Sequence, residues 1–136
     1  MTSSPATCTP DTPIQAVAQT MADEDCGAVP VVESDGSTRP VGVVTDRDIA
    51  VRVVARGKSP DEITAVDVMS EGAVTVRDDA DVDEAARTMK DRQLRRLVVV
   101  DGDGAVVGVL AQADLARSGR DAQTGDVVEE ISEPGG

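Results

Sequence analysis

The chain has 136 residues, contains no Phe, Tyr, Trp or His, and carries a formal net charge of −13 from 26 acidic and 13 basic residues. Without histidine it lacks the commonest general base and metal ligand, and its acidity and lack of aromatic rings disfavour nucleic-acid binding. The length suits one compact unit with an aliphatic core. Halves of about 60 residues are marginal alone, so we expect them to share that core.

The first half predicts alternating helices and strands. Thr12 is a favourable N-cap and Pro13 a favourable first helical residue, so a helix is expected from there to about Asp25. Turn residues at 34–37 separate two short apolar runs, which predicts a hairpin. The expected elements after the first helix are strands at 28–32 and 41–44 and a second helix at 47–55, opened by Thr45-Asp46 and closed by Gly57.

The second half predicts the same series. A short helical lead-in at 65–69 precedes a strand at 73–76, a helix at 82–92, strands at 96–100 and 106–110, and a helix at 112–117. The last residues are polar and acidic, which indicates a disordered tail.

The two halves repeat one pattern. An apolar stripe with the i, i+3, i+4, i+7 spacing of an amphipathic helix occurs twice, 68 positions apart, at Ile14, Val17, Ala18 and Met21 and again at Val82, Ala85, Ala86 and Met89. Further on, the segment 42–49 is echoed by 108–115 at an offset of 66, because the second hairpin loop is two residues shorter. We therefore expect an internal duplication.

Three short motifs, in their order and spacing, carry a family resemblance: 27–32 (Gly-Ala-Val-Pro-Val-Val), 42–49 (Gly-Val-Val-Thr-Asp-Arg-Asp-Ile) and 95–101 (Arg-Arg-Leu-Val-Val-Val-Asp). The chain resembles a tandem pair of cystathionine-β-synthase (CBS) domains, or Bateman module, and is similar to the stand-alone actinobacterial pairs of the hypoxic-response type. The resemblance implies an α/β fold in which two β-α-β-β-α repeats pack about a pseudo-two-fold axis as one module. The expected divisions are repeat one at 1–57, a linker and lead-in helix at 58–68, repeat two at 69–118 and an acidic tail at 119–136.

The resemblance also implies a function. It predicts a non-enzymatic regulatory module that binds an adenosine-containing ligand (AMP, ADP, ATP or S-adenosylmethionine) and signals through a homodimer, with an unidentified protein partner. The alternative is a structural dimerisation module with vestigial clefts that acts through a protein partner. No nucleophile stands beside a base, so the sequence gives no support to an enzyme. No apolar run is long enough for a membrane span and no signal peptide is apparent, so we expect a cytoplasmic protein.

Thr45 and Asp48 are the principal candidate site residues. At the start of a helix, the Thr45 hydroxyl and the free N–H groups of the first turn can meet an anionic oxygen. The Asp48 carboxylate, on the same face, can accept both hydroxyls of a ribose. The alternative is that Thr45 is only an N-cap and Asp48 only a favourable first-turn charge.

The resemblance implies two clefts. The first combines Val43, Thr45, Arg47 and Asp48 with Val74, Thr75, Arg95 and Arg96 of the other repeat. A guanidinium suits phosphate, so Arg47, Arg92, Arg95 and Arg96 form a candidate phosphate trap; the alternative is that they pair with Asp91, Asp101 or the acidic tail.

The second, weaker cleft would combine Thr7, Cys8, Gly27, Ala28 and Asp114. Ala111 stands where the first cleft has Thr45, and Gly27 and Ala28 stand where it has arginines. We therefore predict one nucleotide per chain. Cys8 and Cys26 are interpreted as buried reduced thiols, and no metal site is expected.

Overall fold

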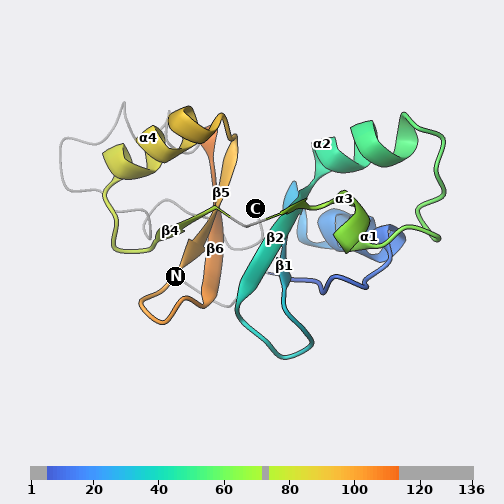
Figure 1. Cartoon of the computed structure of the whole chain (residues 1–136), viewed down its shortest axis with the longest axis horizontal. Coiled ribbons are helices and arrows are strands. Elements are labelled where there is room, and N and C mark those ends of the chain that lie inside the picture. The colour runs from blue at the N-terminus through green and yellow to red at the C-terminus, as the bar shows by residue number, and fades with distance from the viewer. Residues whose placement is uncertain (1–5, 72–73, 114–136) are drawn as a thin grey trace.

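The computed structural model of the chain describes residues 6–71 and 74–113. Figure 1 shows two α/β units side by side, with their strands toward the middle and α1 and α4 farther out. The elements in chain order are α1 (Ile14–Glu24), β1 (Ala28–Val32), β2 (Pro40–Thr45), α2 (Asp46–Ile49), η1 (Ala50–Val54), α3 (Ala65–Val68), β3 (Ser70–Glu71), β4 (Thr75–Arg77), α4 (Val82–Arg92), β5 (Arg96–Val100) and β6 (Val106–Ala111).

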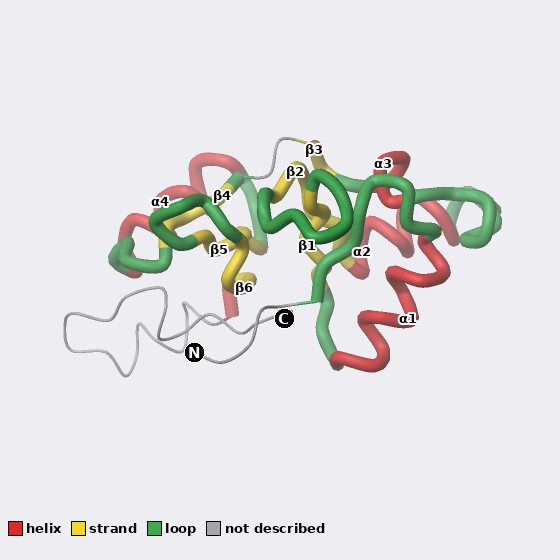
Figure 2. The backbone as a smooth tube through the Cα atoms, turned by 90° about the horizontal axis from the view of Figure 1, so that it is seen from below, coloured by secondary structure: helices red, strands yellow, loops and turns green. Residues whose placement is uncertain are grey.

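Each unit contains a three-stranded sheet, of order β1-β2-β3 in the first and β4-β5-β6 in the second. β1 pairs antiparallel with β2, and β5 pairs antiparallel with β6. β4 runs parallel to β5. Viewed from below, the strands again lie between the helices of the two units (Figure 2).

The strand pairing confirms the duplication residue by residue. Cys8 forms a parallel bridge with Val31, and 68 positions later Val76 pairs in parallel with Val99. The register of each hairpin shifts at the same place, after Val31 and after Val99. The helices end alike, because α1 and α4 are both followed by a residue in the left-handed conformation, Asp25 (φ 52°) and Gln93 (φ 55°).

Two details of the first repeat differ from the sequence prediction. Thr12 is not the N-cap of α1; its hydroxyl instead accepts the Thr9 N–H at 3.0 Å in the preceding turn, and Pro13 takes the N-cap position. The predicted second helix is present but begins one residue earlier, and only 46–49 are α-helical, while 50–54 continue as a π-helix. β1, α4 and β5 have the predicted bounds.

The segment that connects the repeats packs on the first one. Ala65 and Val68 of α3 are fully buried in the core of repeat one. β3, which the sequence did not indicate, pairs with β2, with Gly42 opposite Glu71. Gly42 permits this approach, since a Cβ there would lie 2.7 Å from the Met69 sulfur and 2.8 Å from the Ser70 carbonyl oxygen.

The described core consists of three apolar clusters, so the expectation of one shared core was wrong in detail. Two of the clusters each lie within one repeat, one around α1 and the first sheet and one around α4 and the second sheet. The third joins the repeats and contains Val32 from one repeat and Val98, Val100 and Val106 from the other. The Val106 N–H also donates to the Thr38 carbonyl at 2.9 Å. The two halves are thus separate in their main cores and joined by a valine interface.

None of the helices in the described ranges is long and apolar enough to cross a membrane. Of the predicted last helix, only 112–113 are described, and they are helical. The expected acidic tail lies outside the described residues.

Candidate functional site

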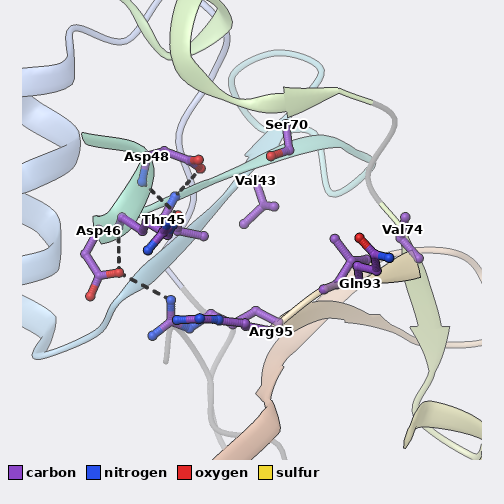
Figure 3. A pocket seen from close by; sticks show the side chains of 11 residues that line it. Val43, Thr45, Asp46, Asp48, Ser70, Val74, Gln93 and Arg95 are labelled. Carbon is purple, nitrogen blue, oxygen red and sulfur yellow. Dashed lines mark hydrogen bonds and ion pairs between the residues drawn. The ribbon is translucent and has the colours of Figure 1, made fainter. Parts of the chain in front are cut away.

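A pocket of about 350 Å³ opens between the two repeats. Figure 3 shows Thr45, Asp46 and Asp48 on one side of it and Val74 and Gln93 on the opposite side. The lining residues are Val43, Thr45, Asp46, Arg47, Asp48 and Ser70 from the β2–α2 junction and β3, and Val74, Gln93, Leu94, Arg95 and Arg96 from repeat two.

Seven of the eight residues predicted for the first cleft line this pocket. The exception is Thr75, which is exposed at the start of β4 and lines a different depression. Sequence reasoning missed four lining residues: Asp46, Ser70, Gln93 and Leu94. Gln93 and Leu94 directly precede the predicted Arg95, so their position in the chain was an available signal. Ser70 depends on β3, which is too short to show a period.

Thr45 and Asp48 form a capping box. The Asp48 N–H donates to the Thr45 hydroxyl at 3.1 Å, and the Thr45 N–H donates to Asp48 Oδ2 at 3.0 Å. The N-cap interpretation is therefore correct for both residues. Asp48 Oδ1 accepts no hydrogen bond from any described residue and remains able to accept one from a ligand.

A second Thr-x-x-Asp segment shows that the cap alone does not make a site. At the start of α3, the Thr64 N–H donates to Asp67 Oδ2 at 3.1 Å, as Thr45 does to Asp48. Neither Thr64 nor Asp67 lines the pocket between the repeats. What distinguishes Thr45 and Asp48 is the opposing wall that repeat two supplies.

The first-turn N–H groups of α2 are already bonded, so the expectation that they are free for an anion was wrong. The Asp46 N–H donates to the Gly27 carbonyl at 2.9 Å. The Arg47 N–H donates to Asp46 Oδ1 at 2.8 Å, and the Thr45 hydroxyl takes the Asp48 N–H. The Gly27 carbonyl and two short side chains of the same turn thus occupy the donors that a ligand anion would use.

Arg96 reaches across to repeat one and pairs with Asp46. Its Nη1 lies 3.3 Å from Asp46 Oδ1, and its side chain is only 26% exposed, against 62% for Asp46. Gly27 makes room for the guanidinium, since a Cβ there would lie 2.7 Å from Arg96 Nη2. The buried Arg96 Nε has no hydrogen-bond partner within the described part of the chain. The predicted alternative, pairing of an arginine with an acid, holds for Arg96, although its partner is none of the acids considered.

Two arginines of the predicted phosphate trap remain exposed at the pocket. Arg47 and Arg95 line it and form no ion pair among residues 6–71 and 74–113. Arg92 is exposed on the last turn of α4 and is not part of the lining. The accessible cations of the site are therefore Arg47 and Arg95.

The residues predicted for the second cleft are only partly described. Ala28 is fully buried at the start of β1, and Cys8 is 9% exposed in the core of repeat one. Gly27 lies against the Arg96 guanidinium, and Thr7 is exposed. Asp114 lies outside the described residues, so the second cleft as a whole stays a prediction.

Both cysteines are free thiols. Burial raises the pKa of Cys8 from 9.0 to about 12, and burial also raises the pKa of the half-buried Cys26. A raised thiol pKa lowers the fraction of reactive thiolate at neutral pH. Within the described ranges, no group of three or more Cys, Asp or Glu side chains is placed to hold a metal ion.

Comparison with known proteins follows the same division into two repeats. The family model of the CBS domain matches twice, at residues 1–55 and 65–121. The chain belongs to the CBS domain family. It is a tandem CBS pair, a regulatory module.

Its relatives include proteins from archaea and bacteria. Over 99 residues it is 37% identical to MK0525 of Methanopyrus kandleri, covering 73% of this chain but half of that protein. It is 34% identical over 104 residues to hypoxic response protein 1 of Mycobacterium tuberculosis, covering 76% of this chain and 71% of that protein. The CBS domain protein PAE2072 of Pyrobaculum aerophilum, solved in complex with AMP, superposes with a TM-score of 0.74 at 32% identity, covering 83% of this chain and 84% of PAE2072.

Proposed function

We propose that this CBS pair is a non-enzymatic sensor that binds an adenosine-containing ligand in the pocket between its repeats. The observation that carries the proposal is the meeting of the Thr45–Asp48 turn with Val74 and Arg95 across one pocket of about 350 Å³. That volume is within the range of small-molecule sites. The similarity to PAE2072, whose structure contains AMP, supports the same ligand class.

The pocket side chains suit the parts of such a ligand. Asp48 Oδ1 would accept the ribose hydroxyls while Oδ2 keeps its bond to Thr45. Val43, Val74 and Leu94 would contact the base through aliphatic surface, because the chain has no aromatic ring to stack on it. Arg95 would bind phosphate as a bidentate donor, together with Arg47.

The same proposal includes one ligand per chain and a homodimer. Only the first cleft combines a threonine hydroxyl with arginines. In the second cleft, Ala111 stands in place of Thr45, and Gly27 and Ala28 stand in place of the arginines. Val51 and Val54 of η1 are 46% and 70% exposed, and such apolar side chains support burial against a second copy or a protein partner.

A structural dimerisation module with vestigial clefts is the second candidate. It is favoured by the internal pairing of the pocket, in which the first-turn N–H groups and Nη1 of Arg96 already have acceptors from the chain itself. Such a pocket needs no ligand to satisfy those groups.

Isothermal titration of nucleotide-free protein with AMP, ADP, ATP and S-adenosylmethionine tests the proposal. Saturable binding near one site per chain is expected. Arg95→Gln should weaken binding of the phosphorylated ligands about tenfold, the cost of one charge-assisted contact. Arg92→Gln is the matched control. It removes the same charge, and Arg92 lies only three residues before Arg95, but its side chain does not line the pocket. No binding of any of the four ligands would favour the structural module.

A further inference from the structure

Asp46 occupies the position at which an anionic ligand would otherwise find its donors. Its Oδ1 accepts the N–H of Arg47 at 2.8 Å and lies 3.3 Å from Nη1 of Arg96. A backbone N–H and a guanidinium are the groups that proteins use to hold a phosphate oxygen. The chain thus places its own carboxylate among them, on the pocket wall (Figure 3).

The surroundings of this carboxylate fix its position. Gly27 accepts the Asp46 N–H through its carbonyl and leaves space for both charged groups, since a Cβ on Gly27 would lie 2.9 Å from Asp46 Oδ2 and 2.7 Å from Arg96 Nη2. Arg96 is held deeper than its partner, at 26% against 62% exposure. Asp46 therefore presents its negative charge to the pocket while its cation is largely covered.

We propose that Asp46 determines the ligand charge that this pocket accepts, so that it selects a nucleoside monophosphate over the corresponding triphosphate. This inference rests on the proposed function. A ligand with one phosphate can bind Arg95 and Arg47 and leave the Asp46–Arg96 pair intact. Each further phosphate brings negative charge toward Asp46, and at short range in a partly covered site such repulsion is not fully screened. Asp46 acts here as a specificity-determining residue and Arg96 as the cation that moderates its charge.

Neutralising Asp46 tests the proposal with little change to the fold. In Asp46→Asn the amide oxygen can still accept the Arg47 N–H, so the turn keeps its hydrogen bond. The AMP and ATP affinities of the unaltered protein and the variant are measured by isothermal titration in magnesium-free buffer at fixed low ionic strength. The unaltered protein should bind AMP more tightly than ATP, and Asp46→Asn should narrow that ratio about tenfold.

Two further variants separate this role from a general charge effect. Asp79→Asn is the matched control, because Asp79 pairs with Arg77 at the same 3.3 Å distance, is 68% exposed and lies outside the pocket; it should leave the ratio unchanged. Arg96→Gln removes the cation that moderates Asp46 and should widen the ratio in favour of AMP.

The outcomes distinguish the two proposals. Binding of both nucleotides with a ratio that Asp46→Asn does not change, or that Asp79→Asn changes equally, overturns the role of Asp46 and leaves the proposed function standing. The same holds if the unaltered protein prefers ATP. If the unaltered protein binds neither nucleotide, the proposed function fails and this inference fails with it.

Discussion

The two capping boxes make it possible to separate ligand binding from helix capping. Asp48 and Asp67 each follow a threonine by three residues, and each accepts that threonine's N–H, at 3.0 and 3.1 Å. Alanine at either position removes this acceptor from the first turn of a four-residue helix. The expected loss in the free energy of unfolding is about 1 kcal/mol for each variant.

Ligand affinity should respond to only one of these substitutions. Asp48→Ala also removes the free Oδ1 that would bind the ribose, and a hydrogen bond to a charged group contributes about 1.5–3 kcal/mol, which corresponds to a rise in Kd of about ten- to a hundredfold. Asp67→Ala should leave the Kd within about twofold, because Asp67 does not line the pocket. Urea denaturation measures the stability of both variants, and isothermal titration with AMP measures their affinity.

The comparison can refute the reasoning in two ways. If Asp67→Ala weakens AMP binding as much as Asp48→Ala, the loss comes from general destabilisation. If Asp48→Ala loses stability but binds AMP like the unaltered protein, then Asp48 is an N-cap only, and the ribose contact assigned to it is wrong.

Three further predictions concern stability. Gly42→Ala should lower the free energy of unfolding, measured by urea denaturation, by about 1–3 kcal/mol, because the added Cβ would lie 2.7 Å from the Met69 sulfur. Gly102→Ala is the control and should lower it less, because the nearest atom to its Cβ is 3.3 Å away on a flexible side chain. Because the pKa of Cys8 is raised in the folded protein, the unfolded chain loses the thiol proton first, and the free energy of unfolding should fall between pH 9 and about 12. Cys8→Ala should make this fall shallower by up to about 1.4 kcal/mol per pH unit. An unchanged dependence of the free energy of unfolding on pH would contradict the burial assigned to this thiol. The Val98 side chain is 1% exposed between the repeats, and Val98→Ala should lower the free energy of unfolding by about 2 kcal/mol. Two separate unfolding transitions, one for each half, would show that the valine interface does not couple them.

The sequence predicted those parts of the fold that depend on local patterns. The bounds of β1, α4 and β5 follow from apolar runs and periodicity. β3 could not be predicted, because a two-residue strand has no period and depends on contact with a distant segment.

The sequence indicated the residues that line the pocket better than the contacts between them. The family motif and the repeat offset indicated which residues face each other, and most of them line the pocket. The pairing of Arg96 with Asp46 could not be predicted, since the two lie 50 positions apart and meet only because Gly27 has no side chain. The first-turn donors were wrongly expected to be free because their acceptors are the Gly27 carbonyl, Asp46 Oδ1 and the Thr45 hydroxyl, and these contacts depend on the folded turn.

The attachment of α3 and β3 to the first repeat has a consequence for dividing the chain. A fragment that ends at residue 57, where the sequence repeat ends, would lack the buried side chains of Ala65 and Val68 and would leave one edge of β2 unpaired. A fragment that ends after residue 71 would retain both. The unit of sequence repetition and the unit of folding are therefore offset along this chain, and residues 65–71 belong to the body that precedes them.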